Sequence, residues 1–98
     1  MLVRIVKMSF EMNAIDTFLS NFEHHKNSIR NFPGCQFLEL YQDQQESNVF
    51  FTYSFWQNPE DLEIYRQSDL FKTVWSKTKP LFNAKPQAWS VDKIVSLP

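Results

Sequence analysis

Hydrophobic and polar positions along the chain change their period several times, and each change marks the expected boundary of an element. Residues 2–10 alternate loosely and carry apolar side chains on both sides, which predicts a strand. Apolar residues then recur every three or four positions over residues 15–29, which predicts an amphipathic helix with Asn13 as its N-cap. The Pro-Gly pair at residues 33–34 is expected to end that helix, because proline disfavours helical backbone before it and glycine suits a turn.

Two strands are predicted next, at residues 35–41 and 49–56, joined by a polar connector at residues 43–48. The second of these strands has large apolar side chains on both faces. The pattern alone leaves open which face looks at the helices. The two competing sets are Val49, Phe51, Tyr53 and Phe55 on one side and Phe50, Thr52, Ser54 and Trp56 on the other.

The last part of the chain predicts a helical region in two pieces and a final strand. Asn58 followed by Pro59 and two acidic residues is a typical helix start, and Ser68 is a second N-cap, opening a helix that runs to Thr78. A strand is expected at residues 88–95. The order β-α-β-β-α-β predicts an α+β fold of the ferredoxin-like kind, with a four-stranded antiparallel sheet and its helices on one face.

That architecture leaves one face of the sheet without helices, although its central strands carry apolar groups on both faces. Monomeric proteins rarely expose apolar patches larger than a few hundred Å². We therefore expect a homodimer through the uncovered sheet face, in which two sheets close an eight-stranded, dimeric α/β barrel.

Composition narrows the class of protein. The 98 residues form one domain, residues 1–98, and 16% of them are aromatic. A net charge of −1 gives no electrostatic footprint for nucleic acid or an anionic membrane, and no apolar run is long enough to span a bilayer. The single cysteine excludes an internal disulfide, and the single glycine excludes a dinucleotide-binding turn. No signal peptide is visible, so a cytoplasmic setting is expected.

Three segments resemble the antibiotic biosynthesis monooxygenase (ABM) family: IRNFPGCQFLEL at residues 29–40, FTYSFWQNPEDL at residues 51–62, and SDLF at residues 68–71. The resemblance runs over roughly residues 2–95. It implies a dimeric α/β barrel with a pocket between helices and sheet in each subunit. Members of the family include cofactor-independent oxygenases of aromatic polyketides, quinol oxygenases and haem-degrading enzymes. The resemblance places Trp75 where haem-degrading members carry an axial histidine, and because an indole cannot ligate iron we do not expect haem.

Several side chains could carry chemistry. His25 lies on the apolar stripe of the first helix and could act as a general base, although a packed histidine is the alternative. Tyr53 and Tyr65 could direct hydroxyl groups into an aromatic pocket that Trp75 helps to line, although core packing explains these residues as well. Trp56 resembles, in position, a tryptophan linked to catalysis in oxygenase members of the family.

Two functions remain open. The first is a cofactor-independent monooxygenase acting on a small electron-rich aromatic, such as a phenol or quinol, with neither a metal nor another cofactor. The second is a non-catalytic or stress-related dimer of the same fold that binds a small aromatic or hydrophobic ligand. Arg4 and Lys7 on the first strand are interpreted as edge or interface charges, with binding of an anion as the alternative.

Overall fold

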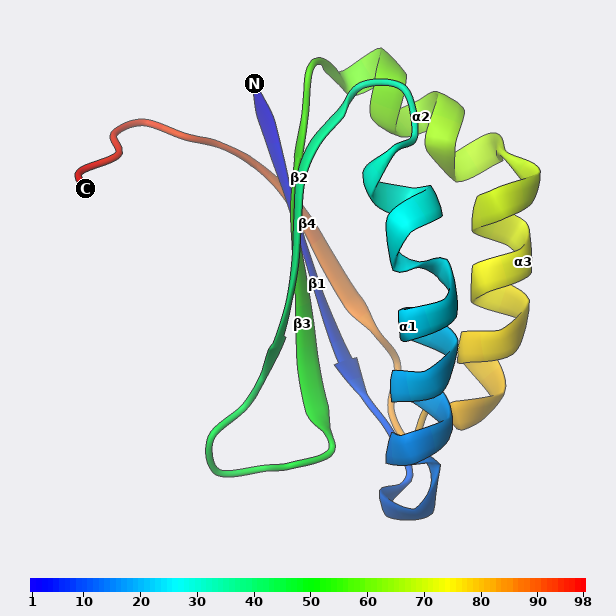
Figure 1. Cartoon of the computed structure of the whole chain (residues 1–98). Helices are drawn as coiled ribbons and strands as arrows, with labels where there is room; N and C mark the ends of the chain where they lie inside the picture. The colour runs from blue at the N-terminus through cyan, green and yellow to red at the C-terminus, as the bar shows by residue number, and fades with distance from the viewer.

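The computed structural model describes residues 1–98, and its elements follow the expected order. All three α-helices cover the same face of a single sheet (Figure 1). The strands are antiparallel and lie in the order β2-β3-β1-β4, which confirms the ferredoxin-like α+β fold. The elements are β1 (Leu2–Ser9), the 3-10 turn η1 (Met12–Ala14), α1 (Ile15–Arg30), β2 (Cys35–Gln42), β3 (Val49–Trp56), α2 (Pro59–Gln67), α3 (Asp69–Thr78), the 3-10 turn η2 (Lys79–Leu81) and β4 (Gln87–Asp92).

Helix starts were predicted correctly in two cases out of three. The side chain of Asn58 accepts a hydrogen bond from the backbone N–H of Asp61 at 2.9 Å, and that of Ser68 accepts one from Phe71 at 3.1 Å. The prediction of Asn13 as an N-cap is wrong. The chain enters α1 through η1, where no side chain caps the helix, because a tight backbone turn provides the entry instead.

The final strand is shorter than predicted and covers Gln87–Asp92. Its partner is β1, and Asp92 pairs with Leu2, the first residue of that strand. Beyond Asp92 no partner backbone remains, so Ile94 and Val95 leave the sheet and are exposed to solvent. The pattern of apolar residues continues past the point where hydrogen-bonding partners end.

The register of the sheet decides which residues face the helices. Trp56 and Phe50 of β3 are almost completely buried, on the same side as Met8 of β1. Tyr53 is three residues from both Phe50 and Trp56 along the strand, so its side chain lies on the other, uncovered face. There it pairs with Ile5, and the centroid of its ring lies 5.2 Å from that of Phe55. The prediction that Tyr53 contributes to a binding pocket between helices and sheet is therefore not supported, because the register turns the other set of β3 side chains toward the helices.

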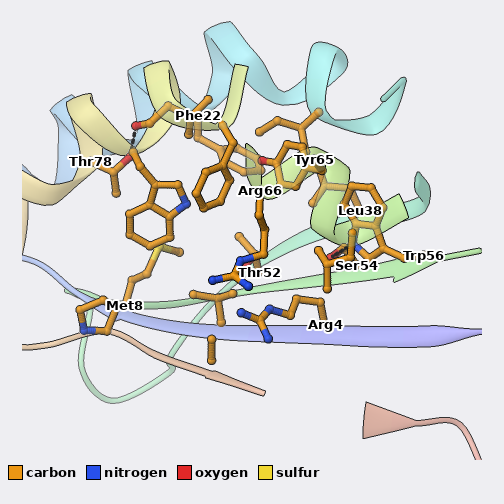
Figure 2. Close-up of a pocket in the computed structure, with 18 of the residues that line it drawn as sticks. Arg4, Met8, Phe22, Leu38, Thr52, Ser54, Trp56, Tyr65, Arg66 and Thr78 are labelled. Atoms are coloured by element: carbon orange, nitrogen blue, oxygen red, sulfur yellow. Dashed lines mark hydrogen bonds between the residues drawn. The ribbon is translucent and has the colours of Figure 1, made fainter. Parts of the chain in front are cut away.

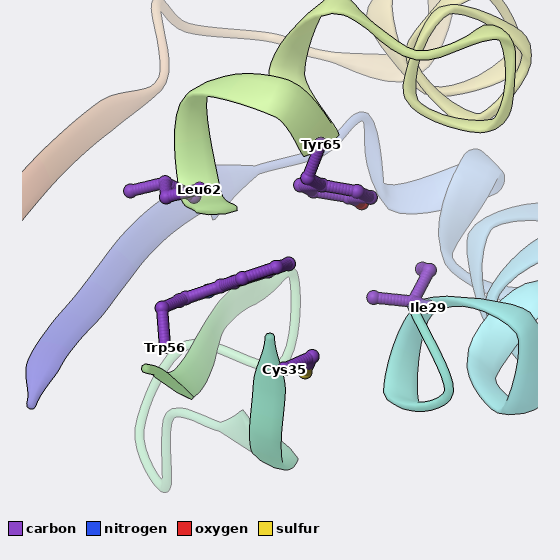
Figure 3. Close-up of a cluster of buried hydrophobic side chains, with 5 residues drawn as sticks. All are labelled: Ile29, Cys35, Trp56, Leu62 and Tyr65. Atoms are coloured by element: carbon purple, nitrogen blue, oxygen red, sulfur yellow. The ribbon is translucent and has the colours of Figure 1, made fainter. Parts of the chain in front are cut away.

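The hydrophobic core is divided into two clusters between the helices and the sheet. One cluster joins α1, β2, β3 and α2 and consists of Ile29, Cys35, Trp56, Leu62 and Tyr65. Figure 3 shows Leu62 and Tyr65 of α2 turned toward Trp56 and Cys35 on the strands. The second cluster lies nearer the start of α1 and consists of Met8, Phe10, Phe18 and Phe50.

The sheet face opposite the helices is covered by no other element of the chain (Figure 1). It is rich in apolar side chains, and several of them are well exposed, including Tyr41, Trp89 and Val91. Rings of neighbouring strands pack against one another on it, as Phe37 does on Phe55 with centroids 4.6 Å apart. None of the helices combines the length and apolar character that a membrane span would need.

Candidate functional site

A cavity of about 280 Å³ lies between the helices and the sheet, and 13 of the 19 residues lining it are hydrophobic. It separates the two core clusters, since members of both contribute to its wall. Figure 2 shows the lining side chains converging from the strands below and the helices above. An engineered cavity of about 150 Å³ holds benzene, so this one has room for a substituted ring or a small bicyclic ligand.

Trp56 and Tyr65 form one wall of the cavity. Their rings stack with centroids 5.0 Å apart, and the indole N–H of Trp56 donates to the hydroxyl of Ser54 at 3.0 Å. Because Ser54 lies two residues earlier on the same strand, the bond fixes the plane of the indole. Both predicted residues, Trp56 and Tyr65, line the cavity.

Tyr65 belongs to α2 and is held by aromatic neighbours on several sides. The rings of Phe32 and Phe71 meet it edge-on at 5.3 and 5.2 Å. Burial, with a smaller contribution from Cys35, raises the pKa of the Tyr65 hydroxyl far above its usual range. At neutral pH this hydroxyl is therefore a hydrogen-bond donor that does not ionise.

Trp75 lines the cavity from α3, as the sequence predicted. Its ring lies 5.7 Å from Phe71 and 5.8 Å from Phe82, so aromatic contacts continue from the Tyr65 end of the cavity to the end near η2. Such a continuous aromatic wall favours a flat ligand, because ring faces and edges pack best against other rings.

His25 does not line the cavity. It shares the apolar stripe of α1 with Phe22 and Ile29, and these two residues do line it. The Nε2 atom of His25 is buried without a hydrogen-bond partner. Burial lowers the pKa of His25, with further lowering by His24 and by Lys77 of α3, so the imidazole is neutral at pH 7. The prediction of His25 as a base facing the ligand is not supported by its position.

Two arginines lie in the cavity wall. Arg66 was not predicted as a site residue, and Arg4 was interpreted as an edge or interface charge with anion binding as the alternative; its place in the wall favours that alternative. Arg4 reaches the cavity from β1, and Arg66 reaches it from α2 (Figure 2). The sequence contains a signal for each. Arg4 alternates with Val6 and Met8 and so lies on the same face of the strand, and Arg66 directly follows Tyr65. A cation within an apolar set of strand residues is the feature that could have identified Arg4.

The remaining polar groups of the wall are hydroxyls, contributed by Thr52, Ser54 and Thr78, and no acidic residue lines the cavity. No three histidine, cysteine or acidic side chains in the chain lie close enough together to hold a metal ion. The site can therefore bind an aromatic ring between aromatic walls and provide hydrogen-bond donors to a negatively charged oxygen of the ligand. These donors are the two guanidinium groups and the Tyr65 hydroxyl.

Comparison with known proteins gives one family and a common fold. The family model described as antibiotic biosynthesis monooxygenase matches residues 1–75. The crystal structure of an antibiotic biosynthesis monooxygenase is 20% identical, with a TM-score of 0.90 over 97% of this chain and 100% of that one. A conserved protein from Methanosarcina mazei is 16% identical, with a TM-score of 0.87 over 94% and 92% of the two chains. A protein from Mycobacterium tuberculosis is 11% identical, with a TM-score of 0.88 over 99% and 98%. No curated protein gives a significant match.

Proposed function

The chain belongs to the antibiotic biosynthesis monooxygenase family, and from that premise we propose that it is a cofactor-independent monooxygenase of small, electron-rich aromatic compounds. The proposed substrates are phenols and quinols with one or two rings. The observation that carries the proposal is the cavity itself: an aromatic wall formed by Trp56, Tyr65 and Trp75, with hydrogen-bond donors beside it.

In the proposed reaction the substrate supplies the electrons. An ionised phenol or quinol reduces dioxygen. One oxygen atom replaces a ring hydrogen, the other leaves as water, and the product is a quinone, so that the substrate supplies all four electrons. The protein's part is to bind the ring away from bulk water and to stabilise the negative charge on the substrate oxygen. Tyr65 donates to that oxygen, Trp56 and Trp75 hold the ring, and the two arginines favour the ionised form.

This scheme replaces the base that the sequence suggested. Because His25 lies outside the cavity lining, we assign the loss of the phenolic proton to the field of Arg4 and Arg66, which lowers the pKa of a bound phenol. The proton then leaves to water past Arg66, whose side chain is 48% exposed. No residue of the chain needs to accept it.

A non-catalytic ligand-binding role is the second candidate. It is favoured by one observation, namely that no histidine, cysteine or carboxylate lines the cavity. General acid–base catalysis usually relies on such groups, whose pKa values can be placed near neutrality. A binding protein needs the aromatic walls and the donors but no group that titrates.

Oxygen uptake separates the two candidates. The protein is incubated with a panel of phenols and hydroquinones in the presence of a chelator, and dissolved oxygen is followed. We expect turnover that falls about 10- to 100-fold in Tyr65→Phe, because one donor to the developing oxyanion is lost. Binding across the panel without oxygen uptake establishes the second candidate instead. Loss of turnover in His25→Gln, with unchanged ligand affinity, would return the role of base to His25.

We further propose that the chain forms a homodimer through the uncovered face of the sheet. The support is the exposed apolar set on that face, which includes Tyr41, Trp89 and Val91. Sedimentation velocity at micromolar concentration should give twice the mass of one chain, and Phe55→Lys on that face should give a single chain. A wild-type species of one chain at this concentration would overturn the dimer.

A further inference from the structure

The cavity wall carries positive charge that nothing in the cavity balances. Arg4 and Arg66 are its only charged residues, and the other 17 residues that line it are apolar or uncharged. A guanidinium stays protonated in proteins, so both groups are cations under all ordinary conditions. Two like charges beside an apolar wall repel each other, and an anion bound between them relieves that repulsion.

Arg4 is the more constrained of the two. It is half-buried on the helix-facing side of β1, and its Nη1 atom donates to the hydroxyl of Ser90 on β4 at 2.9 Å. Burial lowers the pKa of Arg4, the neighbouring Arg66 lowers it further, and Glu63 opposes the change. The hydrogen bond to Ser90 orients the side chain but supplies no counter-charge.

The only acidic residue in direct contact with either arginine is Glu63, which contacts Arg66 from outside the cavity. Its carboxylate lies 3.2 Å from the Nη1 atom of Arg66, one turn along α2, and is 56% exposed. Exposed pairs of this kind contribute little and are readily exchanged. The charge of Arg4 remains without a carboxylate partner inside the cavity.

We propose that Arg4 and Arg66 together bind the carboxylate of an aromatic acid whose ring occupies the aromatic part of the cavity. The inference rests on the proposed function, in that the ring lies where the phenol or quinol substrate lies, and it narrows the substrate class to hydroxylated aromatic acids. Two guanidinium groups and one carboxylate leave a net positive charge, which still favours the ionised phenol. Two guanidinium groups, from a strand and a helix on opposite walls of the cavity, approach the same volume (Figure 2).

The geometry suits a carboxylate in particular. A guanidinium presents parallel N–H donors that match the two oxygens of a carboxylate. Phe22, Val74 and Trp75 complete the apolar wall that would receive the ring. A volume of about 280 Å³ accepts a ring with a small anionic substituent.

The test compares two ligands of the same size that differ in one substituent and in charge. The first is 2,5-dihydroxybenzoate, and the second is 2,5-dihydroxybenzamide, in which a neutral amide replaces the carboxylate. Isothermal titration calorimetry on the wild-type protein should show the acid binding at least 10-fold more tightly, because hydrogen bonds to charged groups are the stronger ones. The preference should shrink as salt is added.

Variants locate the effect. Arg66→Gln and Arg4→Gln should each weaken binding of the acid by about 10- to 100-fold and leave binding of the amide within a few-fold. Arg66 is exposed enough that its replacement should not affect folding, so it keeps the test valid if Arg4→Gln is unstable. Lys7→Gln is the matched control, because it removes one positive charge from the opposite face of β1 and should change neither affinity.

Each result decides one question. Equal affinity for the acid and the amide, or an acid preference that survives both arginine variants, overturns the carboxylate site whether or not oxygen is consumed. An acid preference lost in the arginine variants but accompanied by no oxygen uptake supports the carboxylate site and refutes the monooxygenase. Oxygen uptake with the amide alone supports the monooxygenase and overturns the carboxylate site.

Discussion

Gly34 offers a sharp test of how the helices are fixed to the sheet. It lies between α1 and β2, has a φ of +91°, and is the only glycine in the chain. A Cβ atom at this position would overlap the Cβ and Cγ atoms of Asp61 in the first turn of α2. Gly34→Ala therefore introduces two separate penalties, one in the backbone and one between side chains.

The magnitude can be built from these two penalties. A positive φ costs a residue with a Cβ about 1–2 kcal/mol. Relieving the overlap with Asp61 is a case of overpacking, which typically costs a further 1–3 kcal/mol. We expect Gly34→Ala to lower the free energy of unfolding by about 2–5 kcal/mol, which is a large share of the roughly 5–15 kcal/mol that a domain usually has.

Urea denaturation followed by tryptophan fluorescence measures this change at a fixed protein concentration. The double variant Gly34→Ala/Asp61→Gly removes the overlap and keeps the backbone strain. In a double-mutant cycle the two sites should therefore couple by about 1–3 kcal/mol. A loss below 1 kcal/mol for Gly34→Ala, or no coupling in the cycle, would refute the close approach of the turn to α2.

Three other predictions concern the cavity and its surroundings. Ser54→Ala leaves the buried indole N–H of Trp56 without its acceptor and should lower the free energy of unfolding by about 1–3 kcal/mol, whereas in a Trp56→Phe background the same change should cost much less, as urea denaturation can show. Lowering the pH from 7 to 5 should reduce stability, because the pKa of His25 is lowered in the folded protein and its unfolded form, with a pKa near 6.5, binds the proton first. His25→Gln should reduce that pH dependence, and an unchanged slope would show that His25 is not desolvated. Val74→Phe adds a ring within the cavity and should abolish binding of one-ring ligands in calorimetry while leaving the urea midpoint within about 0.5 M of wild type; a large fall in the midpoint would mean that the cavity is already filled by the protein.

The fold was predictable from sequence because its signals are local. The caps at Asn58 and Ser68 rely on contacts within three residues, and both are present. The last strand was overextended because its end depends on where β1 runs out, which is a feature of another part of the chain. Local pattern therefore gave element types, and tertiary pairing set the boundary at Asp92.

The site was predicted less well, for two physical reasons. Alternation could not assign a face to Tyr53, because both faces of β3 are apolar and only the register with the other strands distinguishes them. The apolar stripe of α1 includes His25, but the stripe is wider than the part of the helix that lines the cavity, and His25 lies outside that part. Tyr65 and Trp75 lie on the apolar sides of their helices, which turn toward the sheet, and Trp56 belongs to the set of β3 side chains that the register turns toward the helices.

The cavity is itself an argument for a ligand. Its volume of about 280 Å³ opens to solvent beside Arg66, whose side chain is 48% exposed. Water that enters finds hydrogen-bond partners at Arg4, Arg66 and the hydroxyl groups. It finds none against Phe22 and Trp75, because apolar walls offer water no such partners. A molecule with one anionic end and one aromatic end satisfies both regions at once, which neither water nor a simple hydrocarbon can do.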